Sequence, residues 1–410
     1  MNVEGSGSSR LGALEWKRGA LLSLSFFLVV LGILFTRPLR SALLLEHHSP
    51  DMLPLLWICT GVLAFGWIAL HNRLLRHFIP EKIFLGSAVG TVVSLYLIKE
   101  GFRFDPARAS QALYIWNDIA SIVVIEQIWS LLDDYFNSAQ AKRAFGPIGA
   151  GGILGGIAGA WLSTRMIEHA STLALLDTSV WIMLLLVLPC GLVAFRARRK
   201  FDVRRVEFRR GFRLIREARF LQLFALSVLL VQVVSNVIDL QFNSYVNETF
   251  RTTDDRSRYL GHFFFWMNSF SVLVMIVLPA WLLRRFGVRT GLFVLPVLNS
   301  AAAIGSAFGF QSAFPAAKFL DKGLNYSIQR ASKEILYIPI RSEDRFQLKQ
   351  ILDVFFYRMS ETVAALLVIP FLKLFRWHHL GFLTLALCVA QIAVVVGLFR
   401  ALRAYRSSEI

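Results

Sequence analysis

Cysteine is scarce in this sequence, and the residue patterns of the common catalytic sites are missing. The 410 residues include three cysteines, which lie singly in apolar segments at Cys59, Cys190 and Cys388. Their separation gives neither a disulfide framework nor metal-ligand spacing, so we interpret them as core residues. The sequence also lacks a phosphate-binding loop with a Walker lysine, a nucleophile elbow and a zinc signature. These absences argue against an enzyme and against a bound cofactor.

Metal-binding and targeting signals are weak as well. Two histidine pairs occur in expected outer loops without further ligands at useful spacing, so we interpret them as surface residues: His47-His48 and His378-His379. The first 20 residues contain no small-residue cleavage site and lack the composition of a transit peptide. We therefore expect an uncleaved first span and, as the simplest location, a bacterial inner membrane.

What the sequence has in abundance is apolar residues, which make up 56% of the chain with a mean hydropathy of +0.56. Such a composition over this length is typical of a polytopic helical membrane protein. Twelve runs are long enough to span a bilayer, the tenth being the least apolar. They cover residues 19–36, 52–70, 83–98, 111–132, 145–167, 179–195, 220–245, 260–283, 290–310, 312–329, 351–374 and 380–400.

The distribution of lysine and arginine predicts the orientation of these spans. If both termini are cytoplasmic, the inner segments carry 30 of the 44 basic residues and the outer segments carry 11. The excess persists without the central loop, so the positive-inside rule favours this orientation over its inverse.

Two short matches indicate that the chain repeats itself at half its length. Residues 74–78 (LLRHF) resemble 282–286 (LLRRF), and residues 140–143 (QAKR) resemble 347–350 (QLKQ). Nearly equal offsets favour two six-helix halves related by duplication, which is the architecture of major facilitator transporters. The predicted division is a bundle over residues 1–195, a basic linker over 196–219 and a second bundle over 220–410.

The linker combines eleven basic residues with an apolar edge. Its apolar positions are spaced for one side of a helix: Phe201, Phe208, Phe212 and Ile215. This pattern predicts a basic helix lying on anionic lipids of the inner leaflet. A nucleic-acid-binding patch is the less favoured alternative, and we expect no nucleic-acid partner.

The fifth span begins with the glycine-rich run GPIGAGGILGGIAGA. Its glycines recur at four-residue intervals, as in Gly151 and Gly155 or Gly155 and Gly159. Because small residues at this spacing let two helix backbones approach, we expect close helix packing here rather than phosphate binding.

Charge enters the apolar runs mainly between residues 317 and 361. Five polar side chains form a helical stripe in the tenth span: Lys318, Asp321, Lys322, Asn325 and Gln329. The eleventh span adds Asp353, Arg358 and Glu361. Charges at membrane depth usually face a bundle interior or an aqueous cavity, so this region is the predicted functional site. The alternative is a set of ion pairs that only hold helices together.

Three other spans carry polar groups at depth. Asp118 and Glu126 lie on one broad side of the fourth span, roughly 80° apart on an ideal helix. The seventh span has a stripe at the same spacing as the tenth, comprising Gln232, Ser235, Asn236, Asp239 and Asn243. Arg37 and Arg40 flank Pro38 at the end of the first span. They are candidates for the site, with interfacial snorkelling as the alternative.

Several of these stretches together resemble the ATP:ADP antiporter family of nucleotide transporters, especially its short bacterial members within the major facilitator superfamily. The resemblance covers most of the chain and is carried by residues 140–143 with the following glycines, 239–242 (DLQF), 282–288 (LLRRFGV), 333–337 (KEILY), 349–353 and Arg358. Two positions depart from the family pattern. Arg40 is followed by Ser41 instead of an acid, and the Glu-Leu-Trp triplet is replaced by residues 118–120 (DIA).

The resemblance implies an all-α membrane protein that exchanges or co-transports nucleotides, or another phosphate-bearing anion, by alternating access. Basic groups in a low-dielectric cavity would attract such a substrate. The candidate binding residues are Arg37, Arg40, Asp118, Glu126, Asp239, Lys318, Asp321, Lys322, Asn325 and Arg358. A membrane sensor or lipid-handling protein with the same fold, working through its basic linker, is the alternative.

Overall fold

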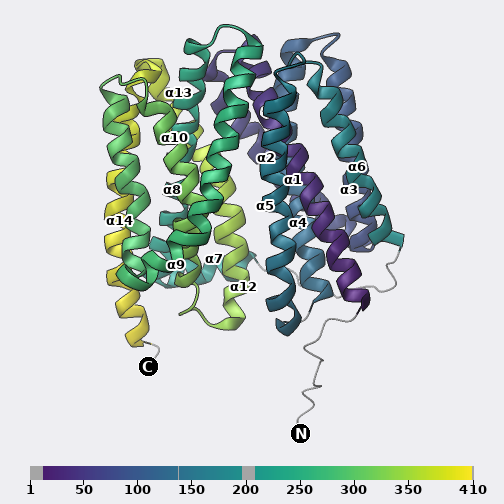
Figure 1. Ribbon diagram of the computed structural model, residues 1–410. Coiled ribbons are helices and arrows are strands. Elements are labelled where there is room, and N and C mark those ends of the chain that lie inside the picture. Colours follow the sequence, from purple (N-terminus) through teal and green to yellow (C-terminus); the bar gives the residue numbers. More distant parts are fainter. Residues whose placement is uncertain (1–12, 137, 196–207, 409–410) are drawn as a thin grey trace. The chain divides into compact units, whose positions relative to one another are not determined.

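The structure is a computed structural model that describes residues 13–136, 138–195 and 208–408 (Figure 1). These residues are predominantly helical and contain no β-strand. The first helices are α1 (Ala13–His47), α2 (Leu53–Leu74), α3 (Pro80–Gly101), α4 (Pro106–Tyr135), α5 (Ser138–Met166) and α6 (Leu175–Phe195). They are followed by α7 (Phe208–Glu217), α8 (Arg219–Thr249), α9 (Thr253–Ala307), α10 (Ala313–Leu324), α11 (Arg330–Leu336), α12 (Ser342–Gln350), α13 (Phe356–Leu374) and α14 (Leu380–Ser408). Two 3-10 turns (Pro50–Met52, Trp377–His379) and two π-helical turns (Asn325–Gln329, Ile351–Phe355) complete the elements.

Eleven segments within the described residues are long and apolar enough to cross a membrane. They coincide with all the expected spans except 312–329, so the prediction of a multi-pass helical membrane protein is confirmed. The remaining span falls where α10, a π-helical turn and α11 follow one another without a break over residues 313–336. At 1.5 Å per residue this run is about 36 Å long, which is enough to cross the hydrocarbon core. Its charged residues make it too polar to be recognised as a membrane span from composition. However, Lys318, Asp321 and Lys322 are all buried by protein.

The long element α9 contains the eighth and ninth expected spans. Gly287 separates them, because its φ of 76° and ψ of 172° are not helical. A residue with a side chain is strained at such a positive φ, whereas glycine adopts it readily. The sequence LLRRFGV around it therefore forms the connection between two spans, as predicted.

The described residues form two compact units. One contains those within 1–47, 62–203 and 252–265, and the other contains those within 48–61, 204–251 and 266–408. The units are defined by contacts in space. The start of α2 therefore belongs to the second unit and the start of α9 to the first. The division of the chain into bundles at residues 195 and 220 stays a prediction.

In the first unit, α1 is the central helix and packs against α4, α5 and α6. The glycines of α5 make the closest approach. A Cβ atom at Gly155 would lie 2.2 Å from the carbonyl oxygen of Phe27, and one at Gly159 would lie 2.2 Å from that of Leu31. The predicted close packing of this glycine run is thereby confirmed, with α1 as the partner helix.

The start of α9 belongs to the first unit because polar contacts fix it there. The Asp254 carboxylate accepts hydrogen bonds from the backbone N–H and the hydroxyl of Thr172, at 2.8 and 2.7 Å. The Arg256 guanidinium donates to the carbonyl oxygen of Leu45 at 2.7 Å. These bonds attach the first turn of α9 to the end of α1 and to the connection between α5 and α6.

In the second unit, α8 is the central helix and packs against α10, α13 and α14. The two π-helical turns occur where α10 meets α11 and where α12 meets α13. A π-helical turn contains one residue more than an α-helical turn, so it changes which side chains face a neighbouring helix. Such turns are frequent at functional sites.

The part of the basic linker that the structure describes forms the helix α7. Its Ile215 is buried, and the Phe212 ring lies edge-on to Phe355 with centroids 5.1 Å apart. Arg210 donates to Asp344 at 2.7 Å. The remaining linker, residues 196–207, lies outside the described residues.

Candidate functional site

The polar stripes of α8 and α10 face each other inside the second unit. Lys318 of α10 forms an ion pair with Asp239 of α8, and the lysine side chain has no exposed surface while the carboxylate keeps 25%. A buried ammonium without an acid would be costly, so this pair neutralises the charge of Lys318, the first residue of the α10 stripe.

One helical turn further along α10, a second group of polar side chains surrounds Asp321. Its carboxylate accepts hydrogen bonds from Ser235 at 2.5 Å and from Asn299 at 3.1 Å. Lys322 donates to the same serine at 2.6 Å and lies 3.9 Å from the carboxylate. The buried acid is therefore satisfied by neutral donors as well as by a lysine, which leaves the Lys322 charge less fully matched than that of Lys318.

The stripes end near the π-helical turn. Asn325 is the first residue of that turn and is partly exposed, while Gln329 at its end is buried. On α8 the side chain of Asn243 donates to the backbone oxygen of Asp239 at 2.7 Å. The structure thus brings five of the ten predicted polar side chains together at the contact between α8 and α10: Ser235, Asp239, Lys318, Asp321 and Lys322.

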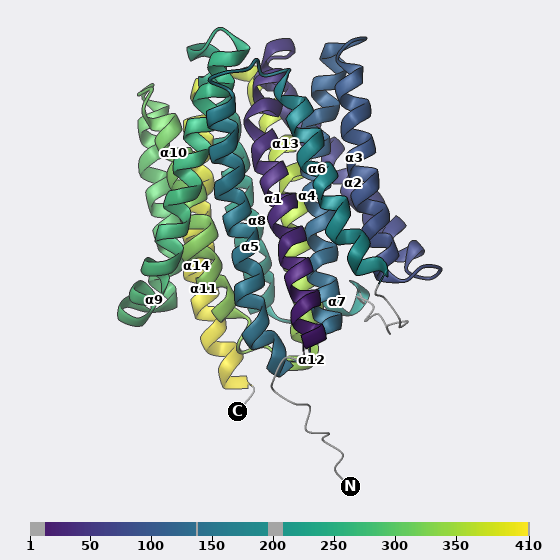
Figure 2. The same ribbon diagram turned by 45° about the vertical axis from the view of Figure 1, so that its right-hand side comes forward.

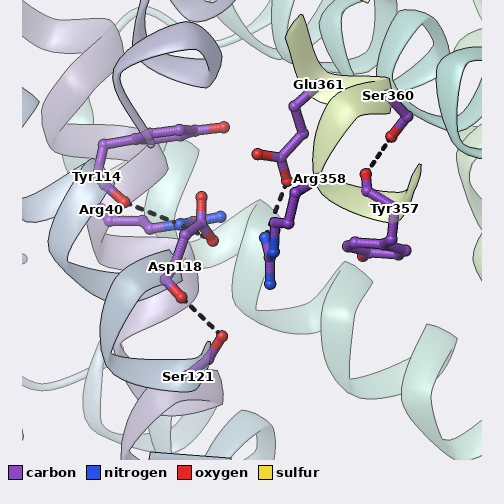
Figure 3. A network of polar contacts seen from close by, with 8 residues as sticks. All are labelled: Arg40, Tyr114, Asp118, Ser121, Tyr357, Arg358, Ser360 and Glu361. Carbon is purple, nitrogen blue, oxygen red and sulfur yellow. Dashed lines mark hydrogen bonds and ion pairs between the residues drawn. The ribbon is translucent and has the colours of Figure 1, made fainter. Parts of the chain in front are cut away.

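The first unit holds a separate charged pair between α1 and α4 (Figure 3). The Arg40 guanidinium donates to the Asp118 carboxylate at 2.6 Å and to the carbonyl oxygen of Tyr114 at 3.0 Å. It also lies over the Tyr114 ring, 4.3 Å from the centroid. Arg40 is 7% exposed and Asp118 is 30% exposed, so the acid is the more accessible partner.

Two other candidates in the first unit lie elsewhere. Arg37 is partly exposed, with its guanidinium 4.9 Å from the centre of the Phe264 ring. Glu126 is exposed on α4, eight residues beyond Asp118 and therefore about 12 Å along the helix axis. Asp118 and Glu126 were expected to share one broad side of α4. Of these two acids, Asp118 is the one that forms the ion pair with Arg40.

The eleventh span carries a third charged pair near the start of α13 (Figure 3). Arg358 donates to Glu361 at 3.1 Å, and the two side chains are 16% and 14% exposed. The guanidinium also lies 5.1 Å from the centre of the Tyr357 ring. The preceding π-helical turn contains Asp353, which instead binds Lys333 and Tyr337.

Several residues of these clusters were not singled out as site candidates from the sequence. Ser235 was recognised only as part of a stripe, although its hydroxyl links Lys322 to Asp321. Asn299 is a buried amide in the ninth span, and its depth alone was an available signal. Tyr114 lies one turn before Asp118, a spacing that predicts a shared helix side.

Each of the four basic residues at these contacts has an acidic neighbour in its own unit. The pairs are Arg40 with Asp118, Lys318 with Asp239, Lys322 with Asp321 and Arg358 with Glu361. Such sites attract anions only where the acid can be displaced or compensated. No cluster of three or more histidine, cysteine or acidic side chains suited to a metal occurs among the residues described.

The fold has clear counterparts among solved structures. The nucleoside transporter NupG superposes with a TM-score of 0.68 at 12% identity, covering 95% of this chain and 99% of that one. A bacterial homologue of the iron transporter ferroportin, in an inward-facing state, gives the same TM-score and identity with the same coverage. The chain therefore has the major facilitator fold, as predicted.

Sequence comparison specifies the family within this fold. The family model described as TLC ATP/ADP transporter matches residues 111–313. ADP,ATP carrier protein 3 of Rickettsia prowazekii is 22% identical over 356 residues, covering 74% of this chain and 70% of the carrier. ADP,ATP carrier protein 1 of Chlamydia pneumoniae is 26% identical over 178 residues, and that match spans only 35% of the carrier's length. Residues 111–313 are thus similar to the TLC ATP/ADP transporter family, and the alignment to the rickettsial carrier extends the similarity to 74% of the chain.

Proposed function

We propose that the protein is a secondary active transporter that exchanges nucleotides or closely related phosphate-bearing anions by alternating access. The similarity of residues 111–313 to the TLC ATP/ADP transporter family and the names of the rickettsial and chlamydial relatives support this substrate class. The observation that carries the proposal is the set of paired charges at membrane depth, which includes partly accessible acids beside arginines. A transport site for an anion needs basic side chains such as these arginines. When no anion is bound, nearby acids must balance their positive charge.

The similarity to ADP,ATP carriers supports exchange, and the paired charges are compatible with it. An anionic phosphate that reaches the first unit would compete with Asp118 for Arg40, and one that reaches the second unit would compete with Glu361 for Arg358. The Arg guanidinium suits this role because it binds carboxylate and phosphate in the same bidentate manner. Releasing one substrate leaves the cations to be compensated again by the acids or by another anion, and binding of a counter-substrate would then carry the return step.

The proposed roles differ among the candidate residues. Arg40, Lys322 and Arg358 would bind phosphate charge, whereas Asp118, Asp239 and Asp321 would balance them in the empty state. Arg37, Glu126 and Asn325 are partly or fully exposed and would contact substrate as it enters or leaves. Lys318 is fully buried against Asp239 and contributes chiefly through that pair.

The placement in the cell is proposed on sequence grounds. The charge asymmetry of the connecting segments supports cytoplasmic termini in a bacterial inner membrane. The exposed basic residues of α7, Arg213 and Arg216 among them, support contact with anionic lipids at the linker. Cysteine-accessibility labelling that reached residue 205 from outside would contradict this orientation.

Counter-exchange in proteoliposomes tests the proposal directly. Vesicles preloaded with ADP should take up labelled ATP saturably, and vesicles without an internal nucleotide should take up much less. Equal uptake into loaded and empty vesicles would contradict exchange. No nucleotide uptake under any loading, together with lipid binding that disappears when the linker is neutralised, would favour a lipid-handling protein.

A substitution at Lys322 tests the binding role of the α10 stripe. We expect Lys322→Gln to weaken nucleotide binding about tenfold or more and to lower the melting temperature less than loss of Lys318 does, since Ser235 and Asn299 still donate to Asp321. The exposed Lys373→Gln variant is the control for a general loss of charge. Unchanged affinity with a depressed melting temperature would assign Lys322 to structural support instead.

A further inference from the structure

A groove in the first unit lies apart from the paired charges. It is lined by the second half of α2 together with α3 and α4, and its volume is about 440 Å³. Figure 2 labels these three helices. The walls include Trp67, Phe78, Ile83 and Val123. A cavity of this size with mainly apolar walls suits a hydrophobic chain.

The few polar groups along the groove already have partners within the protein. The indole N–H of Trp116 donates to Ser94 at 3.0 Å, and the Gln127 amide donates to Ser87 at 2.9 Å. The hydroxyl of Thr91 donates to the Ser87 carbonyl oxygen at 2.8 Å. With these donors used internally, the groove offers little to a polar solute and gains most from an apolar occupant.

Two glycines keep the groove open along α3. A Cβ atom at Gly86 or Gly90 would meet no other atom within 4 Å. These glycines are therefore not needed for helix packing in this unit, in contrast to those of α5. A larger side chain at either position would project into free space and occupy part of the groove.

One end of the groove is positively charged. Lys82 forms part of the lining and is exposed, and Arg76 and His77 are exposed in the turn just before it. The neighbouring Glu81 is buried and accepts a hydrogen bond from Tyr135 at 3.0 Å. The accessible charge at this end is thus basic, which complements an anionic headgroup.

We infer that this groove binds one acyl chain of an anionic phospholipid, with the phosphate of the headgroup against Lys82. The apolar length and the single basic end match the two parts of such a lipid. This site is separate from the linker helix and does not depend on which solute the protein transports.

Lipid titration of the delipidated full-length protein, followed by native mass spectrometry, tests the inference. The probes are dioleoyl phosphatidylglycerol and dioleoyl phosphatidylcholine. We expect Gly90→Leu to weaken binding of both lipids about tenfold, equivalent to losing roughly two buried methylene groups. We expect Lys82→Gln to remove an approximately fivefold preference for phosphatidylglycerol without changing the affinity for phosphatidylcholine.

Matched controls separate the groove from general lipid contact. Gly66→Leu alters another open glycine, on α2 and outside the groove lining, and Lys17→Gln removes another exposed lysine. Both should bind lipid like the unsubstituted protein. Wild-type affinity in Gly90→Leu, or an unchanged headgroup preference in Lys82→Gln, would overturn the inference.

A measurement on the unsubstituted protein makes the test independent of folding. Dihexanoyl phosphatidylglycerol has the same headgroup but short chains, so it should bind much more weakly than the dioleoyl lipid. Equal affinity for the two would show headgroup binding without an acyl chain in the groove and would also overturn the inference.

Discussion

Replacing Lys318 with methionine is expected to lower the free energy of unfolding by about 3–5 kcal/mol. The lysine side chain has no exposed surface and its ion-pair partner Asp239 is three-quarters buried. Removing the ammonium leaves a carboxylate that lacks its nearest countercharge in a largely desolvated position. The remaining exposure of Asp239 places the expected loss near the lower end of this range.

Thermal and denaturant unfolding in detergent measure the loss. The double variant Lys318→Met with Asp239→Leu should recover much of the stability, because replacing both members of a buried pair with apolar groups is often neutral. Lys373→Met, at an exposed lysine, serves as the control. A single Lys318→Met variant that melts like the unsubstituted protein but binds nucleotide poorly would instead make Lys318 a substrate ligand.

The pairing of Lys318 illustrates how far sequence reasoning extends. Helical spacing alone predicted the stripes on α8 and α10, because side chains three and four residues apart share one side of a helix. It did not identify the partner. Asp321 is nearer in sequence, yet Lys318 pairs with Asp239 on another helix, and Asp321 is held by Ser235 and Asn299.

Other features could not be predicted because they depend on tertiary contacts. Local sequence showed the break in α9, since Gly287 lies in a basic connection between two apolar runs. It gave no sign that the start of α9 would be held by Thr172 and Leu45. The same holds for Ile215, because its apolar character fits a lipid surface and a protein surface equally well, and only the structure shows it buried in the apolar core of the second unit.

A second large effect is expected where α5 meets α1. Gly155→Ala should lower the free energy of unfolding by about 3 kcal/mol, because the new methyl group would lie 2.2 Å from the Phe27 carbonyl oxygen. A backbone atom cannot move aside like the end of a side chain, so the helices must separate. Alanine is the better helix former by about 1 kcal/mol, and the steric cost exceeds that gain.

The same helix supplies the control, because Gly149 meets no atom within 4 Å of a Cβ position. Gly149→Ala should leave the melting temperature unchanged or raise it, since only the helix-propensity gain remains. Gly159→Ala, with the Leu31 carbonyl oxygen at 2.2 Å, should behave like Gly155→Ala. Equal melting of the Gly149 and Gly155 variants would mean that the α1–α5 contact tolerates an added methyl group. The stability of the first unit would then depend on its side-chain core and not on the close approach of these two backbones.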